Sequence, residues 1–286
     1  MGQRKANFIG LDIGGTKMEG ILWRGGKIVS TMQIRTPRTR PVFLRALLKL
    51  VSFLGMSGVR GVGLSVAGAI DLRQGKILSS PNLRFLKNFG LRDWVAKRLK
   101  TAVRIDNDAN CFLRGELMFG RARGKKHVVI LTLGTGVGGG VAIDGKLLSG
   151  HQVSAAELGH IVLSREGGRF LTLEDLVSSH GFRRFGIADP LALQNKGFAG
   201  DKKAIAIYRQ IGTYLGAGLA SLINIFDPEL VILGGGISRA DYLLLRPALR
   251  EMPKHTLHSL KVLPPVKISK LKHAGALGAV TLFSAK

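Results

Sequence analysis

An apolar strand that ends in a glycine turn lies at Ala6-Asn7-Phe8-Ile9-Gly10-Leu11-Asp12-Ile13-Gly14-Gly15-Thr16-Lys17. Apolar residues follow at 18–23, and a Gly25-Gly26 pair leads into another strand-like segment at 27–34. Glycine turns between such segments predict an antiparallel meander. The same order of strand, glycine turn, strand and glycine turn recurs at residues 128–148. This internal repeat predicts two similar lobes.

The remaining sequence predicts helices and buried strands around the two meanders. Helical apolar patterns cover residues 41–54, 91–99, 173–182 and 201–226, and further helices begin at residues 240 and 275. Buried strands are expected at residues 61–66, 102–105, 230–233 and 266–268, with a loop holding Gly68, Asp71 and Asn82 and an irregular stretch at 151–168. We therefore expect an α/β protein with an N-terminal lobe at residues 1–115 and a C-terminal lobe at 116–286, whose terminal helix packs back on the first lobe.

The composition excludes several classes of protein. With 286 residues, of which 45% are apolar, the chain is long enough for one large domain or two modest ones. No apolar run approaches the roughly 20 residues of a membrane-spanning helix, and we expect no secretory signal. The single cysteine, Cys111, excludes an internal disulfide and a multi-thiolate metal site. We therefore expect a soluble cytoplasmic protein without a membrane partner.

The formal net charge of +25 is the feature that most favours nucleic-acid binding. However, the basic residues are scattered, aromatic residues make up only 6% of the chain, and no nucleic-acid-binding motif is present. A basic field also attracts ATP, polyphosphate or another anionic substrate, and it is equally typical of a cell with a basic proteome. We expect no nucleic-acid partner.

A step from strand to helix that is rich in carboxylates lies at Ile105-Asp106-Asn107-Asp108-Ala109-Asn110-Cys111. Open α/β sheets bind their ligands at the carboxyl ends of strands, and this step occupies such a place. Asp106 or Asp108 could equally cap the helix, because Asp and Asn are preferred at that position.

Three glycine-rich turns directly follow apolar strands. They contain Gly14-Gly15, Gly134-Thr135-Gly136-Val137-Gly138-Gly139-Gly140 and Gly234-Gly235-Gly236. Backbone N–H groups in such turns can approach phosphate oxygens, although a single glycine turn is most often structural. Neither a Walker A motif nor a dinucleotide fingerprint is present. Asp12 could hold Mg²⁺ through water, and Thr16 and Lys17 could face phosphate, but each is equally consistent with a solvated turn residue.

Five short motifs, in the expected order along the chain, resemble the ROK family of sugar kinases within the actin-like ATPase superfamily. They are Asp12-Ile13-Gly14-Gly15-Thr16-Lys17, Pro81-Asn82-Leu83, Asn107-Asp108-Ala109-Asn110, the turn at 134–140, and Glu157-Leu158-Gly159-His160. The resemblance implies an actin-like, ribonuclease H-like α/β fold of two lobes with a hinged central cleft. It also implies ATP-dependent phosphorylation of a hexose or N-acetylhexosamine, with the 6-hydroxyl as the favoured acceptor and Mg²⁺ as cofactor.

The resemblance also assigns roles to residues. Asp108 would be the catalytic base, in preference to Asp106, and Asp12 would hold Mg²⁺ through water. The sugar would be bound by Gly68, Asn82, Asn107, Glu157, His160 and Glu174. The nucleotide would be bound by Asp12, Gly14, Gly15, Thr16, Lys17, Gly134, Thr135, Gly136, Gly138, Gly139, Gly234, Gly235 and Gly236.

The sequence departs from the family pattern in two places. Family members commonly carry a cysteine-rich zinc segment after the Glu-x-Gly-His motif, but here it is shortened and contains no cysteine, which leaves the register of Glu174 open. We expect no zinc site, and we expect burial of Phe170, Leu171 and Leu173 to hold this segment instead. We also expect no helix-turn-helix of the kind that precedes the kinase body in regulators of the family.

Two other functions fit the same motifs. A polyphosphate-using glucokinase is favoured by the +25 charge, whereas a non-catalytic sugar sensor is disfavoured by the retention of Asp108 and of both phosphate turns. We expect a homodimer that acts on a small-molecule sugar.

Overall fold

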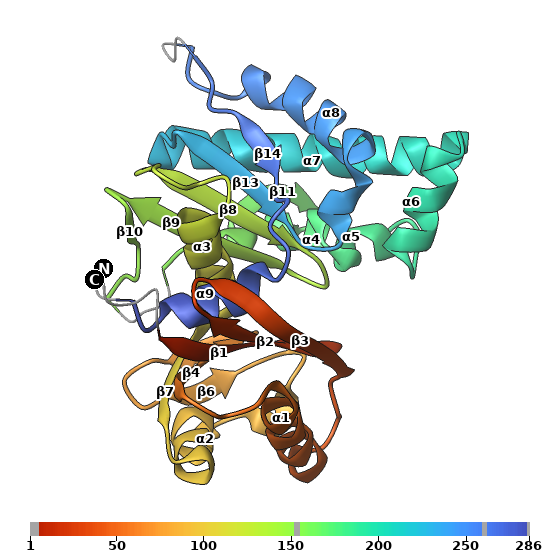
Figure 1. Ribbon diagram of the computed structural model, residues 1–286. Coiled ribbons are helices and arrows are strands. Elements are labelled where there is room, and N and C mark those ends of the chain that lie inside the picture. Colours follow the sequence, from red (N-terminus) through yellow and green to blue (C-terminus); the bar gives the residue numbers. More distant parts are fainter. Residues whose placement is uncertain (1–5, 152–154, 259–261, 285–286) are drawn as a thin grey trace. The chain divides into compact units, whose positions relative to one another are not determined.

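The computed structural model describes residues 6–151, 155–258 and 262–284, and these form two compact units. The first unit comprises residues 6–123, 149–151 and 271–284, and the second comprises residues 124–148, 155–258 and 262–270. Figure 1 shows the chain coloured along its sequence. The division places the whole of α3 (Asp108–Phe119) in the first unit, together with the terminal helix α9 (Ala274–Thr281).

A five-stranded sheet in the order β3-β2-β1-β4-β7 forms the centre of the first unit. Its strands are β1 (Asn7–Ile13), β2 (Lys17–Arg24), β3 (Lys27–Arg35), β4 (Val59–Val66) and β7 (Ala102–Asn107). The first three pair antiparallel, as the predicted meander requires, and β4 and β7 add parallel to β1. Alternate side chains of a strand face opposite sides of its sheet. Ile9 and Leu11 therefore pack on one side with Phe43 and Leu47 of α1 (Arg40–Leu54).

The opposite side of this sheet is covered by α9, which approaches unusually closely because glycines line the contact. A Cβ at Gly10 would lie 2.0 Å from the carbonyl oxygen of Ala276, and a Cβ at Gly63 would lie 2.0 Å from that of Ala279. Gly10 and Gly63 are partners in the β1–β4 register. Only a residue without a Cβ fits at either position, so these glycines set the distance between helix and sheet.

The sheet of the second unit repeats the order of the first, as β10-β9-β8-β13-β14. Its strands are β8 (Val128–Leu133), β9 (Val137–Ile143), β10 (Lys146–Leu147), β13 (Leu230–Gly234) and β14 (Val266–Ile268). Again three strands form an antiparallel meander and two add parallel to its first strand. The internal repeat in the sequence is therefore a repeat of topology.

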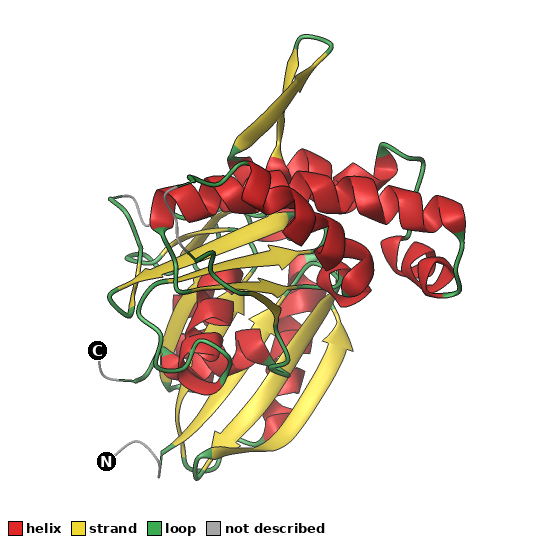
Figure 2. Cartoon of the chain, turned by 90° about the horizontal axis from the view of Figure 1, so that it is seen from above, coloured by secondary structure: helices red, strands yellow, loops and turns green. Residues whose placement is uncertain are grey.

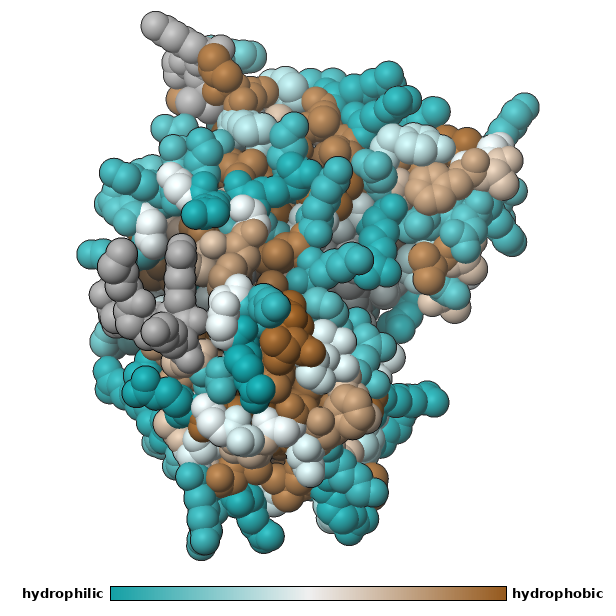
Figure 3. Space-filling view, viewed as in Figure 1, coloured by the Kyte–Doolittle hydropathy of each residue, from teal (hydrophilic) through white to brown (hydrophobic). Residues whose placement is uncertain are grey.

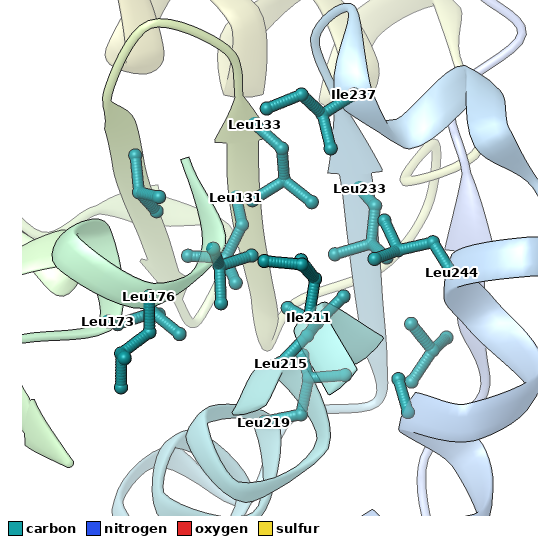
Figure 4. Packing of buried hydrophobic residues seen from close by; sticks show 14 of the residues in the cluster. Leu131, Leu133, Leu173, Leu176, Ile211, Leu215, Leu219, Leu233, Ile237 and Leu244 are labelled. Carbon is teal, nitrogen blue, oxygen red and sulfur yellow. The ribbon is translucent and has the colours of Figure 1, made fainter. Parts of the chain in front are cut away.

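Helices pack on this sheet around one large apolar core. They are α4 (Leu173–Val177), α5 (Ser179–Arg183), α6 (Pro190–Phe198), α7 (Lys202–Phe226) and α8 (Tyr242–Glu251). Leu131 and Leu233 of the sheet meet Ile211 and Leu215 of α7 in the centre of the core (Figure 4). Leu173 reaches the same core from α4. Figure 2 shows these helices in red beside the yellow strands.

Several sequence expectations need correction. The expected loop after Val66 contains a hairpin of β5 (Ala69–Asp71) and β6 (Lys76–Ser79), followed by α2 (Leu91–Leu99). The stretch expected to be irregular contains a second hairpin, β11 (Val162–Glu166) and β12 (Arg169–Thr172). Gly167 and Gly168 make its turn possible, because both have positive φ angles, of 53° and 80°.

The helices differ from expectation in three places. The helix expected at 173–182 is two short helices, because the side chain of Ser178 accepts the N–H of His180 and starts a new helix. The sequence did not predict α6, which has only nine residues. The eighth helix begins at Tyr242 rather than at Ala240, after a short 3₁₀ helix at Ile237–Ala240.

Hydrophilic residues dominate the face drawn in Figure 3. Among the described residues, no helix combines the length and apolar character that crossing a membrane requires.

Candidate active site

Asp106 lies at the end of β7, where its carboxylate is fully engaged. It is only 3% exposed. Its Oδ1 accepts the backbone N–H of Asn107 at 2.8 Å and the side-chain amide of Asn110 at 2.9 Å, and its Oδ2 accepts from Nε of Arg114 at 3.3 Å. A buried charge that is paired in this way supports the local fold. Asp106 therefore holds the strand-to-helix step together.

Asp108, two residues later, is placed differently. It is the first residue of α3 and is half-buried, and its Oδ1 accepts the N–H of Ala109 at 3.0 Å. The helix is capped by Asn107 instead, whose Oδ1 accepts the N–H of Ala109 at 2.8 Å and of Asn110 at 3.4 Å. The residue that caps the helix is therefore Asn107, and neither Asp106 nor Asp108. Of the two carboxylates, Asp108 is the less deeply buried.

Asn107 also connects this step to Gly68. Its Nδ2 donates to the carbonyl of Gly68 at 2.8 Å, and the second N–H of the amide has no partner among the described residues. Gly68 has a φ of 124°, and a Cβ there would lie 2.4 Å from the carbonyl oxygen of Ser79. Only glycine fits there, so position 68 has only its backbone to offer a ligand.

Asp12 is the penultimate residue of β1 and lies beside the first glycine turn. Its Oδ1 accepts the hydroxyl of Ser65 at 2.7 Å, and Glu19 lies opposite it in the β1–β2 register. Burial raises the pKa of Asp12 above its ordinary value; the Ser65 hydrogen bond and Lys17 oppose this shift, and the charge of Glu19 adds to it. Nearby, α9 presents Gly275, where a Cβ would lie 2.6 Å from the Asp12 carboxyl carbon. A cation beside Asp12 would favour its ionised form.

The first glycine turn is closed by its own backbone and by Thr36. The N–H of Gly14 donates to the carbonyl of Lys17 at 3.0 Å, and the N–H of Thr36 donates to that of Thr16 at 3.0 Å. The Thr36 hydroxyl donates to the carbonyl of Gly14 at 2.7 Å. Within the described chain, the N–H groups of Gly15 and Thr16 donate no hydrogen bond. Two adjacent donors are therefore available to an anion.

Neighbouring side chains complete the surroundings of this turn. Asn82 is exposed and lies against Gly15, where a Cβ would meet the Asn82 Cβ at 2.3 Å. Lys17 is exposed, and its ammonium group donates to the side chain of Gln33 at 3.1 Å. The structure thus brings Asn82 next to the turn that was predicted to bind phosphate.

The second glycine turn is also closed by a backbone hydrogen bond and by a hydroxyl residue. The N–H of Gly134 donates to the carbonyl of Gly136 at 2.9 Å. Ser179 donates twice to the carbonyl of Gly134, from its N–H at 2.9 Å and from its hydroxyl at 3.2 Å. In the part of the chain that the structure describes, Thr135 and Gly136 donate no hydrogen bond from their N–H groups.

Glu174 lies against this second turn. Its Oε2 accepts the N–H of Val137 at 2.8 Å, and a Cβ at Gly136 would lie 2.4 Å from the same oxygen. The capping box between Thr172 and Asp175 at the start of α4 fixes the position of Glu174. The register of Glu174, which the sequence left open, therefore places its carboxylate at the glycine turn.

Glu157 precedes a short 3₁₀ helix, Leu158–His160, of which His160 is the last residue, and both side chains are exposed. This segment packs on the glycines of β9, because a Cβ at Gly139 would lie 2.3 Å from the carbonyl oxygen of Ala156. Gly138, one residue before, pairs with Thr132 of β8. The helical turn expected between Glu157 and His160 is present.

The third glycine turn follows β13. The hydroxyl of Ser238 donates to the carbonyl of Gly235 at 2.8 Å. Gly235 has a φ of 85°, and a Cβ there would lie 2.2 Å from the carbonyl oxygen of Leu133. Gly234 ends the strand, and nothing lies within 4 Å of a Cβ placed at Gly236. The space that a side chain at position 236 would occupy is therefore open.

The segment that replaces the zinc loop is held only in part as predicted. Leu171 and Leu173 are buried, but Phe170 is 62% exposed, so the prediction that Phe170 is buried is wrong. Residues of the hairpin alternate between its two faces, and Leu171 takes the inward face. The guanidinium of Arg165 instead lies over the Phe170 ring, 5.5 Å from the ring centroid. Contacts of this kind in the protein span 5.1–5.5 Å. Among the described residues, no three His, Cys, Asp or Glu side chains are grouped as a metal site.

Sequence reasoning missed three hydroxyl residues near the candidate site, Ser65, Thr36 and Ser179. Ser65 could have been noticed, because it is a polar residue inside an apolar strand. Thr36 and Ser179 have no local signal, since each acts on a turn that is distant in the sequence.

Comparison with known proteins places the chain in one family. The ROK family profile matches residues 8–286. A glucokinase of Thermotoga maritima is 34% identical over 308 residues, covering 97% of each chain. An N-acetyl-D-glucosamine kinase of Photobacterium profundum is 32% identical, covering 95% of this chain and 96% of its own.

A solved structure shows the same fold. The ROK family glucokinase of Streptomyces griseus, crystallised with glucose and AMPPNP, superposes with a TM-score of 0.84 at 30% identity, covering 97% of this chain and 99% of its own. The predicted actin-like α/β fold is thereby confirmed. With the profile matched over nearly all of its length and relatives above 30% identity, the chain belongs to the ROK family.

Proposed function

We propose that this protein is an ATP-dependent sugar kinase, which transfers the γ-phosphoryl group of ATP to a hexose or an N-acetylhexosamine. The 6-hydroxyl is the acceptor that we favour, as in a glucokinase. The observation that carries the proposal is the contrast at the end of β7: Asp106 is fully engaged in the fold, whereas Asp108 is half-buried at the start of α3. The names of the Thermotoga and Streptomyces relatives support it.

The chemistry requires a base and precise alignment. A sugar hydroxyl is a poor nucleophile, so the enzyme must hold it in line with the γ-phosphorus and remove its proton as the new P–O bond forms. Asp108 accepts that proton in this proposal, and the leaving group is ADP. Asn107 caps α3 and thereby fixes the helical turn on which Asp108 is carried.

The two glycine turns would bind the phosphates. Each presents two successive N–H groups that have no partner within the described residues, at Gly15 and Thr16 and at Thr135 and Gly136. Backbone donors held in place by the fold stabilise the charge of a transferring phosphoryl group without reorganising. The third turn, Gly234 to Gly236, is assigned to the nucleoside.

Mg²⁺ fits the residues around Asp12. Proteins commonly bind this ion through one or two carboxylates, while it keeps several waters and contacts the substrate phosphates. Asp12 offers one carboxylate beside the phosphate turn, and Ser65 fixes its orientation. When bound, Mg²⁺ would neutralise charge on the phosphates. Asp12 would hold it through water.

We assign the sugar hydroxyls to side chains that are accessible in each unit. In the first unit these are Asn82 and the remaining N–H of Asn107, together with the backbone of Gly68. In the second unit Glu157 and His160 are exposed and carry the matching family motif. Glu174 was assigned to the sugar as well, but its bond to Val137 favours a role in supporting the second turn.

The test is a coupled assay of ADP release over a panel of hexoses and N-acetylhexosamines. We expect turnover with ATP, Mg²⁺ and at least one of these sugars. A parallel arm replaces ATP with polyphosphate and follows sugar phosphate directly, because the net charge of +25 favours a polyanionic donor as the second candidate. Tight sugar binding without turnover with either donor would identify a sugar sensor and would contradict the kinase proposal.

A further inference from the structure

The carbonyl of the first glycine in each phosphate turn is held by a hydroxyl from elsewhere in the same unit. At Gly14 the donor is Thr36, at 2.7 Å, and Thr36 is only 5% exposed. At Gly134 the donor is Ser179, at 3.2 Å, assisted by its own N–H at 2.9 Å. Both hydroxyls therefore act on equivalent atoms of the internal repeat.

The two donors do not come from equivalent elements. Thr36 follows β3, the last strand of the first meander, whereas Ser179 is the first residue of α5. The repeated sheet topology therefore does not explain why both carbonyls are held. Two unrelated segments supply the same hydrogen bond to the same atom, which indicates that the turn itself requires it.

Peptide geometry explains the requirement. The carbonyl of one residue and the N–H of the next belong to one planar trans peptide and point in opposite directions. A donor on the Gly14 carbonyl therefore directs the Gly15 N–H away from Thr36, and a donor on the Gly134 carbonyl directs the Thr135 N–H away from Ser179. Glycine has the widest choice of backbone angles, so this peptide would otherwise be free to rotate.

We propose that Thr36 is a positioning residue for the donor phosphates, and that Ser179 is its counterpart in the second unit. By holding the Gly14 carbonyl, the Thr36 hydroxyl keeps the Gly15 N–H aimed at a phosphate oxygen before the nucleotide arrives. The inference rests on the proposed kinase function, because it requires that the turns bind phosphate. Neither hydroxyl needs to touch the nucleotide.

The test compares binding of AMPPNP with Mg²⁺ by isothermal titration calorimetry. Thr36→Val keeps the shape and the backbone N–H but removes the hydroxyl, and we expect its Kd for AMPPNP to rise about tenfold. Thr36→Ser should restore binding to within about twofold of wild type. Ser179→Ala retains the N–H donor to Gly134, so its Kd should rise only about threefold.

Thr281→Val is the matched control. Thr281 is 7% exposed and donates its hydroxyl to the carbonyl of Gly278 at 2.6 Å, so the variant loses a bond of the same kind inside the same unit. Its melting temperature should fall as that of Thr36→Val does, while its Kd for AMPPNP stays at the wild-type value. The KM for sugar, measured at saturating ATP, should stay unchanged in both variants.

Several results would contradict the positioning role of Thr36. Equal Kd values for wild type and Thr36→Val would overturn the inference, and so would equal weakening by Thr36→Val and Thr281→Val. If Thr36→Val does not fold, Thr36→Ser and Ser179→Ala carry the test, and wild-type affinity in Ser179→Ala would overturn it. Wild-type protein that binds no AMPPNP would contradict the kinase proposal itself, which is a result distinct from any difference between variants.

Discussion

Nε of Arg114 donates to Oδ2 of Asp106 at 3.3 Å, and this bond is one of three that engage the Asp106 carboxylate. The pair spans the first turns of α3 and ties that helix to the end of β7. Because all three of these bonds lie within the strand-to-helix step, the carboxylate supports the local fold. We therefore propose separate roles for the two acidic residues of this motif, structural for Asp106 and chemical for Asp108.

Replacing Asp108 by Asn tests the chemical role. Asp108→Asn keeps the shape of the side chain but removes the base, and a positioned base typically contributes about 10²–10⁴-fold. We expect kcat in the coupled assay to fall by that factor, while the Kd for sugar changes little. A variant that keeps more than about a tenth of the wild-type turnover would show that Asp108 is not the base.

Asp106→Asn is the matched comparison. The amide cannot accept from three donors as a carboxylate does, so we expect a loss of roughly 1–3 kcal/mol in the free energy of unfolding. Urea denaturation measures it. Stability equal to wild type would contradict the structural role of Asp106.

Asp12 gives a prediction about pH. Because its pKa is raised in the folded protein, the folded state holds the proton more tightly than the unfolded chain does. Ionisation therefore costs stability as the pH rises from the ordinary value of 3.8 through the raised pKa. Asp12→Asn removes this cost, so without Mg²⁺ its melting temperature at pH 7 should exceed that of wild type, and the difference should narrow as the pH falls toward 4.

The control for Asp12 is Asp93→Asn, at a carboxylate that is 67% exposed. It should show no comparable gain at pH 7. Added Mg²⁺ should raise the melting temperature of wild type more than that of Asp12→Asn. An equal rise in both proteins would contradict the assignment of Asp12 to the metal.

The close contact of α9 with the first sheet predicts a large effect of one methyl group. In Gly63→Ala the Cβ would lie 2.0 Å from the carbonyl oxygen of Ala279, and backbone atoms would have to move. We expect a loss of about 3 kcal/mol or more in the free energy of unfolding. Gly90→Ala is the control, because nothing lies within 4 Å of a Cβ at that position. Similar stability of the two variants in urea would rule out this packing.

The purified protein is expected to contain no stoichiometric zinc. Zinc in structural sites is almost always held by four Cys or His ligands, and the segment that replaces the zinc loop contains no cysteine. Elemental analysis after chelation and dialysis checks this, and activity should return when Mg²⁺ is restored. About one zinc per chain would mean that ligands from a second subunit, or from distant histidines such as His151 and His180, complete a site.

The elements that the sequence predicted well are those whose pattern is local and long. The two meanders, β13, β14 and α7 follow directly from apolar periodicity and glycine turns, and the motif residues followed from the family resemblance. The hairpin β11–β12 could not be recognised, because its strands have only five and four residues and are largely exposed. Phe170 was predicted to be buried because it is apolar. Side chains alternate between the two faces of β12, however, and Phe170 points outward.

At the candidate site, too, only residues with a local sequence pattern could be predicted. Asp108 and the glycines could be proposed as site residues because each motif is contiguous in the sequence. The hydroxyls of Thr36 and Ser179 could not, since they act on carbonyls 22 and 45 residues away, and only the folded chain brings these atoms together. Asn107 was predicted to bind sugar, but its capping bonds to α3 depend on the dihedral angles of the helix start.

The glycine-lined contact between α9 and the first sheet has a consequence for biosynthesis. A ribosome makes β1 and β4 early and the residues of α9 last among the described elements, so Gly10 and Gly63 have no covering helix during most of translation. Domains generally fold as they emerge, with the N-terminal one first. Here the order is reversed: the second unit can complete its sheet while the first still lacks a layer. Until α9 has been made, the nascent first unit therefore exposes Ile21, which α9 covers in the finished fold.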